Sequence, residues 1–314
     1  ILMSEKKIPL WIDTDTGVDD AVMLMCASEL EELDIKGISA VAGNVEEEKT
    51  FRNARAVMSL CGKEEIKVYP GAKTPLMIPL ETAAHVHGDD GLGGAIIPDS
   101  KAPLETEYGY DAMYRTAKEL NGELVVAAVG PLTNIAIAII KYPDITKYIK
   151  ELVIMGGAVV GGNATPSAEF NIYVDPHAAE TVFKSGIPVK MFGLDVTLKS
   201  SLTMNEIEAI CEGTNAKAKL FKDSTSKAVS VYEQRLGVKK LCLHDVCPIM
   251  YLVYPELFTL VKAGVFVETE SDITFGKTVA DIYSDFKFED RHCEVAMDVK
   301  QEEFARKVTE LILK

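Results

Sequence analysis

The sequence predicts an α/β fold of the Rossmann-like kind, in which helices flank a mostly parallel central sheet. Two observations lead to this prediction. Short apolar and β-branched runs alternate with stretches of helical periodicity along most of the chain, which is typical of strand–helix–strand units. The chain has 314 residues, 47% of them hydrophobic, which is enough to bury a core on both faces of such a sheet.

The predicted strands are short apolar runs, most of which end where polar or glycine-rich segments begin. They comprise residues 8–12, 33–41, 66–69, 124–129, 152–155 and 189–192. Helices are predicted over residues 19–30 and 46–60, and from Pro131 onward, because a first helical turn tolerates the missing N–H of proline. Asp175 and Pro176 are typical of a helix N-cap and first turn, so another helix is expected there.

The last third of the chain is less regular. A long helix is predicted roughly over residues 205–234, and strands near residues 258–267 and 293–297. An amphipathic helix is predicted to close the chain, since its apolar residues share one face: Phe304, Val308, Leu311 and Ile312. We expect one domain over residues 1–314 with a helical excursion, two lobes being the alternative. Ile1 and Leu2 precede the first methionine and are left out of this interpretation.

The composition limits the possible functions. Lysine and arginine number 33 against 48 aspartates and glutamates, which gives a formal net charge of −15. Such a surface repels phosphate backbones, so we expect no nucleic-acid partner, but a small uncharged substrate or a cation. The six cysteines form no CxxC pair and are expected to be reduced, which favours a cytoplasmic protein. Neither a secretory signal nor an apolar run of ~18 residues is apparent, so no membrane partner is expected.

Polar or glycine-rich segments follow four of the predicted strands. In open parallel sheets, ligands bind beyond the carboxyl ends of the strands, which lie along one edge. We therefore expect these segments to form one site: residues 13–20, 43–44, 130–134 and 156–171.

The first of these segments is rich in carboxylates. Residues 13–20 read Asp-Thr-Asp-Thr-Gly-Val-Asp-Asp at a predicted strand-to-helix turn. Helix capping accounts for one or two acidic residues at such a place. The four together, Asp13, Asp15, Asp19 and Asp20, repel one another, and a bound cation relieves this repulsion. The pattern therefore favours a metal site.

Other metal or carboxylate sites fit less well. An EF-hand loop counted from Asp13 needs glycine and glutamate where the sequence has Val18 and Leu24. A phosphatase of the haloacid dehalogenase type also begins with Asp-x-Asp after a strand. It stays open as an alternative, although it leaves Asp19 and Asp20 without a role.

Two histidine-based alternatives are also weak. The spacing of Cys242, His244 and Cys247 matches no common structural zinc site and lacks a fourth ligand. His85 and His87 precede Asp89 and Asp90 as in metallo-β-lactamase-type hydrolases, but those enzymes have histidine where Asp90 stands and further histidines downstream.

The acidic run resembles the N-terminal signature of the inosine–uridine-preferring nucleoside hydrolases, Asp-x-Asp-Pro-Gly-x-Asp-Asp-Ala, with Thr16 in place of proline. Six further segments resemble this family in the same order: residues 41–44, 87–92, 129–134, 155–158, 163–171 and 243–245. One such match would be weak evidence, whereas this many in order make coincidence improbable.

The resemblance implies the nucleoside hydrolase fold and a calcium-dependent hydrolysis of the N-glycosidic bond of ribonucleosides. It implies that Ca²⁺ is bound by Asp15, Asp20, Asp245 and the backbone carbonyl of Val129, and that Asp15 takes the proton of the attacking water. Asp13 would orient these ligands. The implied substrate-binding residues are Asp19, Asn44, His87, Met155, Asn163, Glu169, Phe170, Asn171 and Tyr232.

The leaving base needs a proton or an equivalent hydrogen bond. By resemblance His244 is the candidate acid, His87 flanks the base, and Tyr232 could join a relay. The sequence does not choose among these roles, or between purine and pyrimidine substrates. The resemblance also implies a homodimer or homotetramer. A non-catalytic nucleoside- or ribose-binding protein is a second alternative.

Overall fold

A computed structural model describes residues 6–283, 288 and 291–314. Its centre is a nine-stranded sheet with the order β10-β9-β11-β6-β5-β4-β1-β2-β3. The strands are β1 (Ile8–Thr14), β2 (Leu33–Ala40), β3 (Val68–Tyr69), β4 (Leu124–Ala128), β5 (Ile149–Met155), β6 (Val189–Phe192), β9 (Phe258–Val267), β10 (Thr278–Asp281) and β11 (Cys293–Val299). All neighbours from β3 to β11 pair in parallel, whereas β9 is antiparallel to both β11 and β10. The predicted α/β fold with a mostly parallel sheet is therefore confirmed.

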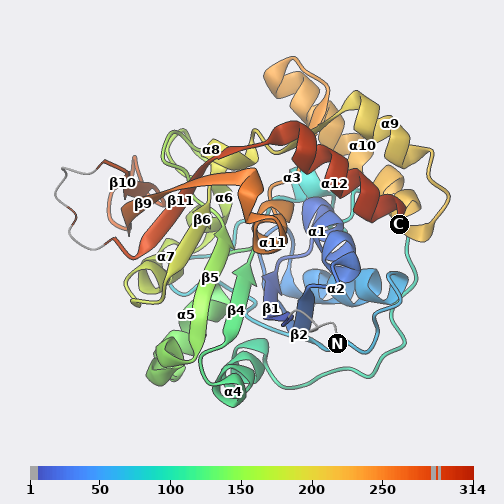
Figure 1. The fold of residues 1–314 in the computed structure, drawn as a ribbon. Helices are drawn as coiled ribbons and strands as arrows, with labels where there is room; N and C mark the ends of the chain where they lie inside the picture. Colours follow the sequence, from blue (N-terminus) through green and yellow to red (C-terminus); the bar gives the residue numbers. More distant parts are fainter. Residues whose placement is uncertain (1–5, 284–287, 289–290) are drawn as a thin grey trace.

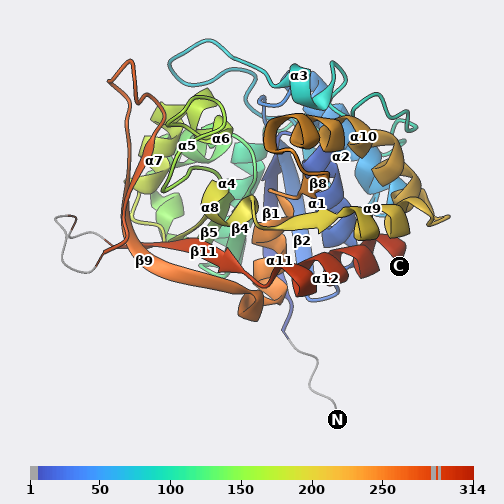
Figure 2. The ribbon, with the colours of Figure 1, turned by 90° about the horizontal axis from the view of Figure 1, so that it is seen from above.

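Helices cover both faces of the sheet (Figures 1 and 2). One face carries α1 (Val18–Glu29), α2 (Glu47–Leu60), α11 (Val246–Val253) and α12 (Gln301–Leu313). The other carries α4 (Gly109–Leu120), α5 (Thr133–Lys141) and α7 (Pro176–Phe183). Residues of one strand alternate between the faces: Val125 packs with the first helices and Val126 with the second.

The helical excursion, which is the segment around residues 205–234, differs from its prediction. Residues 205–234 do not form one helix but parts of two, α9 (Met204–Cys211) and α10 (Ala216–Leu236). The side chain of Asn215 accepts a hydrogen bond from the Ala218 N–H and caps the second helix. A Cβ at Gly213 would lie 2.7 Å from the Ala218 side chain, so the turn between the helices is tight. A small antiparallel pair, β7 (Ser201–Thr203) and β8 (Lys240–Cys242), flanks this excursion.

Other helix boundaries were tested as well, and one of them differs from its prediction by two residues. The helix expected from Pro131 begins only at Thr133, because Leu132 occupies the N-cap and Pro131 stays in the turn. The expected helix start at Asp175 and Pro176 is confirmed, with the Asp175 carboxylate accepting the Ala178 N–H. The remaining short helices are α3 (Ala84–His87), α6 (Phe170–Val174) and α8 (Leu194–Thr197).

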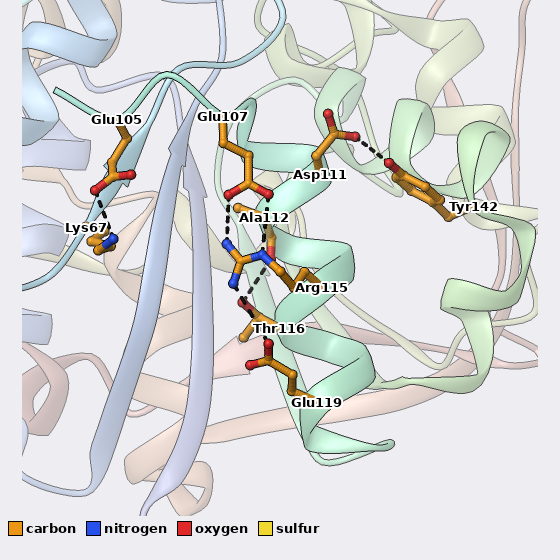
Figure 3. Close-up of polar contacts among 9 residues, drawn as sticks. All are labelled: Lys67, Glu105, Glu107, Asp111, Ala112, Arg115, Thr116, Glu119 and Tyr142. Carbon is orange, nitrogen blue, oxygen red and sulfur yellow. Dashed lines mark hydrogen bonds and ion pairs between the residues drawn. The ribbon is translucent and has the colours of Figure 1, made fainter.

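Helix α4 was not predicted from the sequence, and polar contacts hold its outer side (Figure 3). The Arg115 guanidinium donates to Glu107, 2.7 Å away in the preceding loop, and lies 3.9 Å from Glu119 one turn further along. The Tyr142 hydroxyl, from the end of α5, donates to Asp111 at 2.9 Å. These contacts fasten the loop before α4 and the neighbouring helix to it.

No helix in the described part of the chain is long and apolar enough to cross a membrane. All six cysteines are free thiols, four of them buried.

Candidate functional site

The polar segments that follow the strands converge on one cavity of about 570 Å³. Most of the predicted site residues line it: Asp19, Asn44, His87, Val129, Met155, Asn163, Glu169, Phe170, Asn171, Tyr232, His244 and Asp245. The other three, Asp13, Asp15 and Asp20, are fully buried and are not part of its wall. Segments more than two hundred residues apart in sequence, such as those of Asp19 and Asp245, therefore meet at one place, as expected for residues that follow the carboxyl ends of parallel strands.

Three carboxylates from the two ends of the chain form a cluster. Oxygen atoms of Asp19, Asp20 and Asp245 all lie within 4.8 Å of one another. Burial, followed by the charge of Asp20, raises the pKa of Asp19 to about 7. Burial likewise raises the pKa of Asp245 well above its usual value, and the charges of Asp19 and Asp20 add to this. A cation among these oxygens would remove the repulsion that raises the pKa values.

Asp15 is held beside this cluster by close backbone contacts. Its Oδ2 accepts the Asn44 N–H at 2.8 Å, while its buried Oδ1 has no hydrogen-bond partner among the described residues. A Cβ at Gly43 would overlap Oδ2, and one at Gly130 would lie 2.8 Å from Oδ1. Both glycines are therefore needed for the close approach, which gives a physical reason for these residues after β2 and β4. An unpartnered buried carboxylate oxygen suits a metal ligand.

Asp20 is fixed from three sides. Its Oδ1 accepts the Thr14 hydroxyl at 2.5 Å, and its Oδ2 accepts the Gly17 N–H and the Asn44 amide, each at 3.0 Å. Burial raises the pKa of Asp20, and the hydrogen bonds from Thr14 and Gly17 oppose this effect. Asn44, predicted on the sugar side of the site, therefore also orients a carboxylate of the cluster.

Asp13, near the end of β1, connects this strand to β2 and α5 by hydrogen bonds. Its Oδ2 accepts hydrogen bonds from the Ser39 hydroxyl on β2 and from the Asn134 amide on α5, the latter at 2.7 Å. Burial raises the pKa of Asp13 to about 7, although both hydrogen bonds lower it. Among the described residues, the Asp13 side chain is hydrogen-bonded to these two side chains and to no carboxylate of the cluster, which fits a supporting position.

The sugar-side candidates are organised around the start of α6. The Asn171 amide donates to the carbonyls of Val129 (2.9 Å) and Met155 (3.0 Å), so it spans the ends of β4 and β5. The Glu169 carboxylate accepts the N–H groups of Asn171 and Gly157, at 2.9 and 2.8 Å, and caps α6. Burial raises the pKa of Glu169 to about 7 against these hydrogen bonds. The Asn163 Oδ1 accepts the Phe170 N–H at 2.9 Å.

The two histidines differ in their partners. His87 Nδ1 accepts the backbone N–H of Val18 at 3.0 Å, so the ring proton sits on Nε2. Burial lowers the pKa of His87 to about 3 and that of His244 to about 4. His244 Nε2 lies 2.6 Å from the Tyr232 hydroxyl, which brings together the two members of the predicted relay.

Several residues in the cavity wall or directly behind it were not predicted. Glu81 and His85 come from the segment before His87, and Tyr173 comes from α6. Thr197 contacts His244 from α8. Glu81, Tyr173 and Thr197 belong to no motif, and His85 was considered only in a zinc-type motif that did not fit, so only the folded arrangement places them at this site.

The fold and the site together define an α/β enzyme whose buried carboxylate cluster opens into a cleft lined with amides and histidines. Residues 10–306 match the model of the inosine-uridine preferring nucleoside hydrolases. The chain belongs to this family and is a nucleoside hydrolase, as the resemblance of its motifs predicted.

Relatives and solved structures agree with this assignment. The chain is 40% identical to the pyrimidine-specific ribonucleoside hydrolase RihA of Citrobacter koseri over 277 residues, which are 88% of this chain and 89% of that protein. It superposes on the plant nucleoside hydrolase PpNRh1 with a TM-score of 0.91 and 29% identity, over 97% of this chain and 98% of the other. The purine-preferring ribonucleoside hydrolase of Gardnerella vaginalis gives a TM-score of 0.90 and 34% identity, over 97% and 99%.

Proposed function

We propose that this nucleoside hydrolase binds Ca²⁺ and uses it to cleave the N-glycosidic bond of ribonucleosides, releasing ribose and the free base. The observation that carries the proposal is the convergence of Asp19, Asp20 and Asp245 at the cavity, beside the unpartnered oxygen of Asp15. All the donors are oxygen atoms, which calcium prefers, and no cysteine or histidine is among them.

The metal ligands proposed are Asp15, Asp20, Asp245 and the carbonyl of Val129. This carbonyl accepts the Asn171 amide, and a carbonyl oxygen has a second lone pair for a cation. When bound, the cation would polarise water and the sugar diol. Asp15 is the proposed general base, and its fixed position beside Gly43 and Gly130 would hold it towards that water.

The ribose hydroxyls would be held by Asp19, Asn163, Glu169 and Asn171, with Asn44, Met155 and Phe170 lining the same region. Hydrogen bonds to parts of the substrate that do not react can provide free energy for distortion at the reacting carbon. Glu169 and Asn163 are fixed by backbone N–H groups, so they would present their remaining lone pairs without rearrangement.

The leaving base would be protonated from the His244 side of the cavity, with Tyr232 as part of the relay. His87 would flank the base, offering its Nε2 hydrogen to an acceptor atom, since Nδ1 is occupied by the Val18 N–H. The relatives named above include pyrimidine-specific and purine-preferring enzymes, so both substrate types belong in the assay.

One assay tests the proposal. The purified protein is stripped of metal with a chelator and incubated with uridine, cytidine and inosine, while free ribose is measured after adding back Ca²⁺, Mg²⁺ or Zn²⁺. We expect release of ribose that Ca²⁺ restores best. Restoration by Zn²⁺ alone would contradict the oxygen ligand set, and no ribose from any nucleoside would contradict the activity.

The same preparation separates the alternatives. A phosphatase would release phosphate from nitrophenyl phosphate, and a binding protein would retain nucleosides without releasing base. The homodimer or homotetramer and the cytoplasmic location stay predictions, the first of which light scattering tests.

A further inference from the structure

Thr197 contacts His244 on the side away from Tyr232. The Thr197 Oγ1 lies 2.8 Å from His244 Nδ1, and the Tyr232 hydroxyl lies 2.6 Å from Nε2 of the same ring. Tyr232 and His244 line the cavity, whereas Thr197 is fully buried and does not. Both nitrogens of the imidazole are therefore held by hydroxyl groups, one buried and one at the cavity.

The hydrogen bond of Thr197 differs from those of four threonines in the longer helices. Thr116, Thr181, Thr225 and Thr309 each donate their hydroxyl to the carbonyl four residues earlier, within their own helix. The corresponding carbonyl for Thr197 is that of Gly193, which accepts the N–H of Thr197 but not its hydroxyl. The Thr197 hydroxyl is directed to His244 instead.

Hydrogen-bond accounting fixes the direction of this contact. A hydroxyl buried without an acceptor for its hydrogen is costly. Among the described residues, the acceptor for the Thr197 hydroxyl is His244 Nδ1, so we infer that this nitrogen carries no proton. The ring hydrogen of the neutral imidazole must then sit on Nε2, where it donates to the Tyr232 oxygen. The chain of donors runs from Thr197 through His244 to Tyr232.

The backbone holds the two residues in this relation. Strands β7 and β8, which follow Thr197 and precede His244, pair in antiparallel register with Ser201 opposite Cys242. The Leu243 N–H donates to the Ser200 carbonyl at 2.9 Å, so the pairing continues to the residue before His244. The contact is thus built into the scaffold rather than made by a mobile side chain.

We propose that Thr197 is a positioning residue, which fixes the ring orientation and the Nε2–H tautomer of His244 and thereby keeps the ring donating to the Tyr232 oxygen at the cavity. The inference rests on the proposed function, in which this side of the cavity protonates the base. Thr197 itself does not touch the substrate.

Kinetics with two kinds of leaving group test this role. Thr197→Val keeps the shape but removes the hydroxyl, so the ring can rotate or change tautomer. We expect kcat for uridine to fall roughly ten- to a hundredfold, the scale of lost support around a site, with little change in KM. Nitrophenyl riboside, whose leaving group needs no proton, should react at a near-normal rate, and Thr197→Ser should restore uridine turnover.

Thr225→Val is the matched control, because it removes a buried threonine hydroxyl from the helix that carries Tyr232 without touching His244. It should leave both substrates unaffected. Equal losses on uridine and nitrophenyl riboside in Thr197→Val, or unchanged uridine turnover, would overturn the proposal. If the valine variant does not fold, Thr197→Ala provides the same comparison.

A spectroscopic measurement is independent of activity. The chain has five histidines, so ¹⁵N-labelled imidazole spectra are simple, and the His244 signal is identified by its loss in His244→Gln. The wild-type ring should be the Nε2–H tautomer, and Thr197→Val should shift it to a mixture. An Nδ1–H tautomer in the wild type would refute the inference. A wild type that hydrolyses no nucleoside would refute the proposed function instead.

Discussion

At the scale of single residues, Asp15 depends closely on the space and the polar contacts that its neighbours provide. It is buried, one of its oxygens has no hydrogen-bond partner in the described part of the chain, and two glycines leave room for it. Asp15→Asn keeps the size but removes both the basic oxygen and a charged metal ligand. We predict a loss of kcat of at least about a thousandfold on uridine, since proton transfer and charge are lost together.

The control for this change is Asp99→Asn, an exposed aspartate paired with Arg52. It should retain full turnover. Thermal melting of both variants would show that the fold persists. A near-normal rate in Asp15→Asn would remove this residue from the chemistry.

Gly43 allows a separate test of the space around Asp15. Gly43→Ala would place a methyl group in overlap with Asp15 Oδ2 and 2.8 Å from Pro131 Cδ. Because both neighbours are held by backbone, we predict displacement of Asp15 and loss of most activity. Gly62→Ala is the control: its Cβ would meet no described atom within 4 Å, and the φ of +69° costs about 1–2 kcal/mol of stability. Steady-state kinetics compares the two, and equal activity would show that Asp15 can adapt.

These residues also show what sequence can predict. The acidic run and the glycines after the strands were found because each segment carries its pattern locally. Thr197 could not be found, since its contact with His244 joins segments 47 residues apart that meet only through the pairing of β7 with β8. The role of Glu169 as the N-cap of α6 was not predicted for a similar reason. The residues next to Glu169 in the sequence do not reveal from which backbone N–H groups its carboxylate accepts hydrogen bonds.

At the scale of elements, periodicity identified most strands and helices but not every boundary. The helix predicted over residues 205–234 is interrupted because Asn215 caps a new helix, and this cap outweighs the continuing apolar pattern. Helix α4 escaped prediction although its residues are amphipathic, and its outer side is held by contacts to a loop and to α5. Such tertiary contacts are not visible in a local pattern.

The cap at Asn215 gives a prediction at this scale. Its Oδ1 accepts the Ala218 N–H at 2.8 Å, and its Nδ2 donates to the Ile312 carbonyl at 3.0 Å, which joins α10 to α12. Asn215→Ala should lower the free energy of unfolding by about 1–2 kcal/mol. Denaturant unfolding measures this change. Turnover by Asn215→Ala should stay normal, because Asn215 does not line the cavity. An unchanged unfolding midpoint in this variant would show that the break between α9 and α10 does not depend on the cap.

At the scale of the whole molecule, the carboxylate cluster joins the first helix to the segment before α11, so removing its cation should affect global stability. Asp15, Asp20 and Asp245 are buried and Asp19 is half-buried beside them, and without a cation their charges repel one another. A cation at a hundred times its dissociation constant would add about 2.7 kcal/mol to the free energy of unfolding. We therefore predict that chelation lowers the melting temperature and that Ca²⁺ restores it.

The pH dependence of this loss has a definite sign. In the metal-free protein the pKa of Asp19 is raised to about 7, above its value in the unfolded chain, so the folded state holds its proton more tightly. This contribution to stability is complete below about pH 4 and is lost as the pH rises through about 7. The metal-free protein should therefore melt at a lower temperature at pH 7.5 than at pH 5.5, and added Ca²⁺ should raise the melting temperature more at pH 7.5. Calorimetry at both pH values, with and without Ca²⁺, measures this; equal Ca²⁺ effects would mean that these carboxylates do not form the cation site.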